Sequence, residues 1–356
     1  MEELQRLVVN AIGDGAFPGA AWEVWRDDNL VDHGAAGQAV VLPCAQSMEL
    51  TTWFDLASLT KVVTSILVLQ QVEAGSLTLD DQASRWFAKL KNDGAQPITI
   101  RDLLTHTSGI LGQQRLFHMV TGRNAMLEAV TALPRNPPGQ EVVYLSQGFI
   151  ILGAIVEEVT GRRLDELVEQ QVNAVLETCF QFNPNSELKH HIAATEDRPD
   201  RGIVWGEVHD GNAFAMDGIA GHAGLFGRVT DVAALGRAML DECNPLLSPA
   251  SKRAMTRNWT SHLGAGRGLG WQMGGSYGSP AGDLLGPRTF GHTGFTGTSL
   301  FCDPEQHIVA VLLTNRVHPS RENLRIHRFR RQFHNAVAGV ASRVSGSSLG
   351  VSEATS

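Results

Sequence analysis

The sequence predicts an α+β fold, a sandwich in which an antiparallel sheet is flanked by helices and carries an inserted, mainly helical region. Alternating apolar and polar residues over about 19–40 are typical of two strands joined by a short turn. Apolar residues at helical spacing dominate from about 58 to 205, and strand-like runs return between about 268 and 315. We therefore expect the two ends of the chain to share one sheet.

The individual elements can be assigned in chain order. A helix is expected over residues 1–15, followed by two strands that turn at residues 27–29. Helical segments separated by Pro and Gly are expected at about 58–74, 78–90, 99–107, 123–133, 148–161 and 163–176. The late strands are expected at 268–273, 297–304 and 307–315, before a basic amphipathic helix over about 322–341.

These elements indicate a single structural unit over residues 1–343. Its sheet part is expected to comprise about 1–75 and 215–343, with the helical insert over about 76–214. Residues 344–356 are small and polar, so we expect a flexible tail.

Composition excludes several kinds of partner. The net charge of −8 and the absence of a basic, aromatic-rich cluster argue against a nucleic-acid partner. The apolar runs are shorter than the roughly 18 residues of a spanning helix, so no membrane span is expected. The N-terminus lacks a signal-peptide pattern, which favours a cytoplasmic location. Four widely spaced cysteines are expected to be reduced thiols; they are Cys44, Cys179, Cys243 and Cys302.

Lys61 is the first candidate catalytic residue. It stands in the apolar run 54–63 of a chain with five lysines and 24 arginines, and lysine, unlike arginine, can lose its proton. Ser58 precedes it by three residues, on the same face of the expected helix and near its free N–H groups, where it could act as a nucleophile. Alternatively, Ser58 is only an N-cap and Lys61 a surface residue. A second S-x-x-K match, Ser186 and Lys189, lies in a polar segment that reads as a loop.

Two later stretches complete a recognisable pattern. Tyr144 precedes an apolar helix, and the triplet His292-Thr293-Gly294 stands just ahead of a strand hairpin. With the S-x-x-K pair, these stretches resemble the active-site elements of the penicillin-recognising serine hydrolases, in the branch of class C β-lactamases, D-alanyl-D-alanine peptidases and β-lactamase-like carboxylesterases. In that family S-x-x-K, Y-x-N and K-T-G or H-T-G follow in this order. The resemblance covers nearly the whole chain.

The resemblance implies a β-lactamase/transpeptidase-like fold and an acyl-enzyme mechanism. Ser58 would attack a carbonyl carbon, and either Lys61 or Tyr144 would take its proton. The N–H groups of Ser58 and Phe295 would stabilise the oxyanion. Substrate binding would involve Ser146, His292, Thr293 and Gly294. No metal or organic cofactor is called for.

The sequence departs from the family pattern at two positions. Ser146 replaces the Asn that contacts the substrate amide, and His292 replaces a Lys, so we expect neither a full amide clamp nor a fixed cation. These departures favour a carboxylesterase-like serine hydrolase of a small ester or amide. A β-lactamase, or a D-Ala-D-Ala or muramyl-peptide amidase-type hydrolase of peptidoglycan fragments, is the alternative. A second alternative is a penicillin-binding relative that is acylated but does not hydrolyse the resulting adduct.

Each of the remaining candidates has a structural alternative. Tyr144 could be a core aromatic and His292 a buried, hydrogen-bonded histidine. His106 and His222 lie beside glycine turns and match no catalytic position of the family, so they are expected to be structural. No zinc site is expected, because the spacing of ligands is wrong among His190, His191, His209 and His222.

Overall fold

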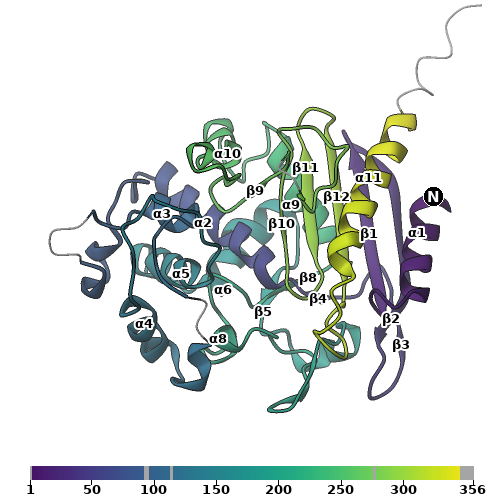
Figure 1. The fold of residues 1–356 in the computed structure, drawn as a ribbon, viewed down its shortest axis with the longest axis horizontal. Coiled ribbons are helices and arrows are strands. Elements are labelled where there is room, and N and C mark those ends of the chain that lie inside the picture. Colours follow the sequence, from purple (N-terminus) through teal and green to yellow (C-terminus); the bar gives the residue numbers. More distant parts are fainter. Residues whose placement is uncertain (1, 92–95, 113–114, 276–277, 345–356) are drawn as a thin grey trace, which may run out of the picture.

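One antiparallel sheet is built from both ends of the chain (Figure 1). The computed structural model describes residues 2–91, 96–112, 115–275 and 278–344. The seven strands have the order β3-β2-β1-β12-β11-β10-β9, and β1 pairs with β12 where the two ends meet. Their bounds are β1 Gly19–Arg26, β2 Asn29–Val40, β3 Gln46–Ser47, β9 Gln272–Met273, β10 Phe290–Thr293, β11 Ser299–Asp303 and β12 Ile308–Thr314. The predicted α+β fold with a shared sheet is confirmed.

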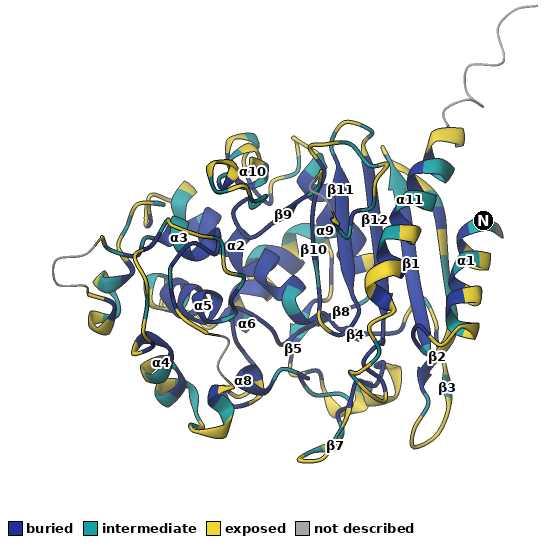
Figure 2. Cartoon of the chain, in the orientation of Figure 1, coloured by how far each residue is buried: buried dark blue, intermediate teal, exposed yellow. Residues whose placement is uncertain are grey.

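Helices cover both faces of the sheet, which explains why β12 is buried along its whole length. On one face, α1 (Glu2–Gly13) and α11 (Ile326–Val344) pack on alternate strand residues such as Ile308 and Leu312. On the other face, α9 (Val229–Leu240) packs on β1, β11 and β12. Figure 2 shows the central strands as buried between these layers.

The helical region lies beside this sandwich (Figure 1). Nearly every residue of α2 (Thr60–Glu73) is buried, and α2 packs on α5 (Gln147–Thr160). The other helices are α3 Ile100–Leu104, α4 Arg123–Thr131, α6 Leu164–Val168, α7 Ala174–Leu176, α8 Gly211–Phe214 and α10 Pro249–Thr256. Small sheets are formed by β4 Phe54–Asp55, β8 Leu225–Gly227 and β5 Gln181–Phe182, and by β6 Asp197–Arg198 with β7 Gly202–Ile203.

Several expected elements differ from the structure. The segment 78–90 forms two 3-10 turns, because the Ala83 N–H donates to Ile98 O instead of joining a helix ladder. The segment 163–176 is interrupted by a π-helical turn, Glu169–Asn173. Of the strand expected over 268–273, only Gln272–Met273 is formed. Gly270 has a φ of +79°, which is not an extended conformation and interrupts the strand.

Two further segments also differ from expectation. The segment 186–191 was expected to be a loop and is a 3-10 helix, which the Asn185 side chain caps at the Glu187 N–H. The expected helix over 58–74 begins with a 3-10 turn, Ala57–Leu59. The expected tail lies outside the described residues, except for Val344, which ends α11.

All four cysteines are free; Cys302 is buried and the other three are exposed. Within the described ranges, no helix has the length and apolar character needed to cross a bilayer.

Stability should depend on pH through a histidine on α11. His334 is fully buried against Phe301 and Phe333, and burial lowers its pKa to about 4. The unfolded chain, with an imidazole pKa of about 6.5, binds this proton first, so the free energy of unfolding should fall as pH drops from about 6.5 to 4, by up to about 1.4 kcal/mol per unit. Urea titrations at pH 7 and pH 5 give the loss in free energy of unfolding between the two pH values. This loss should be smaller in His334→Gln than in the wild type. Parallel slopes in variant and wild type would contradict the prediction.

Candidate active site

The candidate nucleophile lies on a strained turn between β4 and α2. Ser58 is in the 3-10 turn Ala57–Leu59, and Ala57 has a φ of +47°, a region that residues with a Cβ rarely adopt. The Ala57 N–H donates to Asp55 Oδ1 at 2.8 Å. The other carboxylate oxygen of buried Asp55 accepts the His209 N–H at 2.7 Å. Asp55 therefore holds the turn that presents Ser58 at the start of α2.

The structure brings the side chains of Ser58 and Lys61 together. Lys61 Nζ donates to Ser58 Oγ at 2.8 Å and to the His222 carbonyl oxygen at 3.1 Å. The Lys61 side chain is 0 % exposed, so it is not a surface residue. His222 Nε2 is in turn 2.8 Å from Asp210 Oδ1, which fixes the carbonyl-bearing segment beside α2. Lys61 is thus positioned to exchange a proton with the serine hydroxyl.

Cationic and imidazole side chains surround the ring of Tyr144. Lys61 Nζ and Arg267 Cζ each lie 5.2 Å from the centre of the ring. The His106 and His292 rings lie at 4.6 and 5.9 Å, measured between ring centres. Tyr144 is only half-buried and lines the same cavity as Ser58, which separates it from an ordinary core aromatic.

The two imidazoles near Tyr144 are neutral. Burial, with the charges of Lys61 and Arg267 adding to it, lowers the pKa of both His106 and His292 well below its usual range. His292 Nδ1 lies 2.9 Å from the Thr293 carbonyl, which can only accept, so Nδ1 carries the proton. Its buried Nε2 has no hydrogen-bond partner among the described residues. His292 is therefore neutral, with a buried, unprotonated Nε2, and it gives the site no permanent charge.

The turn 294–298, which follows the H-T-G triplet, docks on the segment before Ser58. Thr296 Oγ1 donates to Asp55 O at 2.7 Å, and Thr298 Oγ1 donates to Leu56 O at 3.1 Å. A Cβ on Gly294 would collide with the Thr298 hydroxyl and the Leu56 carbonyl, so this close approach requires glycine. The Phe295 N–H has no acceptor within the described ranges, which leaves it available as an oxyanion donor.

A cavity of about 1110 Å³ connects these groups. The predicted site residues that line it are Ser58, Tyr144, Ser146, His292, Thr293, Gly294 and Phe295, while Lys61 lies buried behind Ser58. The structure therefore brings the expected residues together. Ser186 and Lys189 do not line the cavity.

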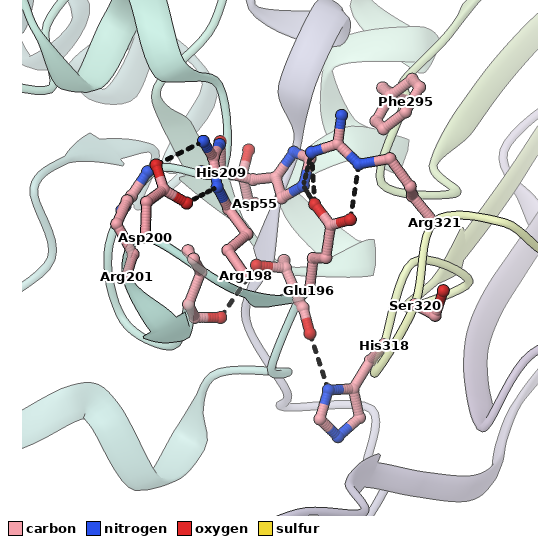
Figure 3. Close-up of polar contacts among 12 residues, drawn as sticks. Asp55, Glu196, Arg198, Asp200, Arg201, His209, Phe295, His318, Ser320 and Arg321 are labelled. Atoms are coloured by element: carbon pink, nitrogen blue, oxygen red, sulfur yellow. Dashed lines mark hydrogen bonds and ion pairs between the residues drawn. The ribbon is translucent and has the colours of Figure 1, made fainter.

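One wall of the cavity is a polar cluster centred on Glu196 (Figure 3). Glu196 accepts hydrogen bonds from Arg321 Nε at 2.5 Å and lies 2.9 Å from His209 Nε2. Burial alone would raise the pKa of Glu196, but these partners outweigh it and lower the pKa to about 2. The His209 ring stacks on Phe295, 5.6 Å between centres, and the Phe295 side chain is 47 % exposed.

Arg267 corrects the expectation of a site without a fixed cation. Its guanidinium lines the cavity beside Tyr144, and no carboxylate of the described residues pairs with it. Burial lowers the pKa of Arg267, yet guanidinium remains charged at neutral pH. Sequence reasoning missed it, since a single Arg before a glycine turn carries no local signal. The roles of Asp55 and of the His222 carbonyl were also missed, because their contacts with His209 and Lys61 join segments far apart in the sequence.

No metal site is found in the part of the chain that the structure describes. Of the histidines considered for zinc, His209 contacts Glu196 and His222 contacts Asp210. Both contacts have a structural explanation, because each fixes a segment that adjoins the cavity.

The beta-lactamase family model matches residues 4–334. A putative D-alanyl-D-alanine carboxypeptidase of Escherichia coli O157:H7 is 32% identical, over 89% of this chain and 82% of that protein. Another, of Salmonella agona (strain SL483), is 30% identical over 91% and 85%.

Similar folds occur among solved structures. EstCE1, a hydrolase with promiscuous acyltransferase activity, has a TM-score of 0.78 at 24% identity, covering 94% of this chain and 97% of that one. An octameric penicillin-binding protein homologue from Pyrococcus abyssi has a TM-score of 0.74 at 22% identity, covering 92% and 76%.

Proposed function

The chain belongs to the beta-lactamase family of serine hydrolases, and on that premise we propose that Ser58 forms an acyl-enzyme with a small ester or amide. The observation that carries the proposal is the 2.8 Å contact of Lys61 Nζ with Ser58 Oγ at the edge of the cavity that Tyr144 also lines. A buried amine in contact with a hydroxyl on a helix N-terminus is suited to nucleophilic catalysis.

The reaction proceeds in two steps. Ser58 Oγ bonds to the carbonyl carbon, and its proton passes to whichever of Lys61 and Tyr144 has lost its own. The N–H groups of Ser58 and Phe295 stabilise the oxyanion, and Tyr144 returns a proton to the leaving group as the bond to that group breaks. In the second step Tyr144 takes a proton from water, which attacks the acyl carbon. The bond from that carbon to Ser58 Oγ breaks, a proton returns to Oγ from Lys61 or Tyr144, and the acid is released.

We propose a small ester as the preferred substrate. Ser146 offers one hydroxyl where the family pattern has an amide, so the grip on an amide substrate is weaker. His292 is neutral, so the H-T-G strand itself holds no cation. An ester has a better leaving group than an amide. Its turnover therefore requires less transition-state stabilisation from contacts with the enzyme.

A carboxypeptidase acting on D-alanyl-D-alanine is the second candidate, and Arg267 is the observation that favours it. Tyr144 protonates the leaving group, so that group lies beside Tyr144 and hence beside Arg267. A guanidinium binds a carboxylate through paired hydrogen bonds. The relatives named as putative D-alanyl-D-alanine carboxypeptidases agree with a leaving group of this kind.

Intact-mass measurement with a fluorophosphonate and with penicillin tests the acyl-enzyme. Fluorophosphonate should add to the wild type and not to Ser58→Ala. A penicillin adduct that forms and then vanishes supports a hydrolase, whereas a lasting adduct supports a penicillin-binding relative. If neither reagent labels Ser58, the proposed function is wrong.

A matched pair of esters tests the role of Arg267. We expect the ratio of kcat/KM for 3-acetoxybenzoate to that for its methyl ester to fall by about 10-fold or more in Arg267→Gln, because a charge-assisted contact to the leaving-group carboxylate is lost. Release of D-alanine from a D-alanyl-D-alanine peptide should fall in parallel if that peptide is a substrate.

The control for this measurement is Arg253→Gln, an exposed arginine of α10 that does not line the cavity. It should leave the ratio unchanged. A ratio that is the same in Arg267→Gln and wild type would show that the guanidinium does not contact the substrate.

A further inference from the structure

Arg330 of α11 is a buried cation without a carboxylate partner. Its side chain is 4 % exposed, and within the described ranges its only hydrogen bonds run from Nη2 to Gly294 O at 2.7 Å and to Thr298 O at 2.9 Å. Burial, with the charge of Arg316 adding to it, lowers the pKa of Arg330 to about 9, so the guanidinium is charged at neutral pH. Burying an unpaired charge is costly, and the cost calls for an explanation.

The two carbonyls that Arg330 contacts close the turn 294–298. The Gly294 N–H donates to Thr298 O at 2.8 Å, and Gly294 O also accepts from the Gly297 N–H at 3.2 Å. Arg330 therefore bridges both ends of the turn from behind, on the side of α11. The turn is held from its other side by Asp55 and Leu56, as described above.

Gly294 O and the Phe295 N–H belong to the same peptide group. A hydrogen bond to the oxygen of an amide withdraws electron density from its nitrogen and makes the N–H a stronger donor. The effect is larger when the donor to the oxygen is charged. The Phe295 N–H has no acceptor among the described residues and is one of the two proposed oxyanion donors.

We propose that Arg330 is a positioning residue that strengthens the oxyanion donor: its charge acts through the Gly294–Phe295 peptide group on the negative charge of the transition state. Arg330 borders the cavity, but in this arrangement it acts through the peptide group and not by contact with the substrate. The inference rests on the proposed function for the identity of the donor, but the polarisation of the peptide group exists without turnover and can be measured separately.

Arg316 provides a matched control. Its Nε donates to Phe295 O at 2.8 Å, which belongs to the next peptide group, between Phe295 and Thr296. Its Nη1 donates to the carbonyls of Arg321 and Asn323. Arg316 thus fixes the same turn without contacting the peptide group of the oxyanion donor. A structural role predicts equal effects for the two arginines, whereas polarisation predicts a larger effect for Arg330.

Kinetics of three variants distinguish these possibilities. Arg330→Gln should lower kcat for p-nitrophenyl butyrate by about 10- to 100-fold, less than the loss of a whole oxyanion donor, with KM changed by less than about threefold. The Kd of phenylboronic acid, which forms a tetrahedral adduct with Ser58, should rise in proportion to the loss of kcat. Arg330→Lys, which keeps the charge, should retain more activity than Arg330→Gln. Arg316→Gln should lose less kcat than Arg330→Gln.

Amide NMR tests the polarisation without turnover. With selective [¹⁵N]Phe labelling, the Phe295 amide proton, assigned by its loss in Phe295→Leu, should move upfield in Arg330→Gln and less in Arg330→Lys and Arg316→Gln. Equal losses in Arg330→Gln and Arg316→Gln, or an unmoved resonance, would overturn the proposal. If Arg330→Gln fails to fold, an Arg330→Lys resonance and kcat equal to those of Arg316→Gln would overturn it. If the resonance moves upfield in Arg330→Gln but no acylating reagent labels the wild-type protein, the polarisation stands while the hydrolase function, and with it a catalytic use of Arg330, is refuted.

Discussion

Lys61→Arg is expected to abolish turnover although it keeps the positive charge. The Lys61 amine is wholly buried, 2.8 Å from Ser58 Oγ and 3.1 Å from the His222 carbonyl. A guanidinium is too large for this space and does not give up its proton, so kcat for p-nitrophenyl butyrate should fall by about 10³-fold or more. Circular dichroism and the melting temperature should show that the variant is folded.

The second S-x-x-K match supplies the control for Lys61. Ser186→Ala and Lys189→Arg, in the 3-10 helix outside the cavity, should both leave kcat unchanged. A folded Lys61→Arg protein with wild-type turnover would exclude proton transfer by Lys61.

Tyr144→Phe is expected to have the second largest effect. The substitution removes one oxygen from a half-buried ring, so packing against His106 should survive. The acylation rate should fall by about 10²-fold or more, the usual scale for the loss of a general base. Stopped-flow measurement of the p-nitrophenolate burst gives this rate apart from deacylation. A variant with an unchanged burst rate and a lower melting temperature would instead identify Tyr144 as a core aromatic.

The parts of the site that could be predicted are those with a local pattern. Ser58 and Lys61 are separated by one helical turn, so a spacing of three residues is enough to bring them together. Tyr144 and the triplet 292–294 carry a signal in their order along the chain, which the family resemblance supplies.

The missed contacts depend on residues far apart in sequence. Arg267 reaches Tyr144, and Arg330 reaches Gly294, through the packing of whole elements. Neither arginine differs locally from the others in this arginine-rich chain. The helix predicted over 78–90 was wrong for a related reason. The Ala83 N–H donates to Ile98 O, which is distant in the sequence, and so does not join a helical hydrogen-bond ladder.

The pairing of β1 with β12 also constrains how the protein is made. β1 pairs with its neighbour β2 early, but it acquires its second partner, β12, only when the chain has been synthesised to residue 314, and Arg330 of α11 contacts the turn 294–298 later still. Such contacts between distant segments form late. A nascent chain released before residue 326 would carry Ser58 and Lys61 but no supported oxyanion donor. Premature termination before α11 would therefore leave fragments that contain Ser58 and Lys61, and we expect these fragments to lack the proposed hydrolase activity.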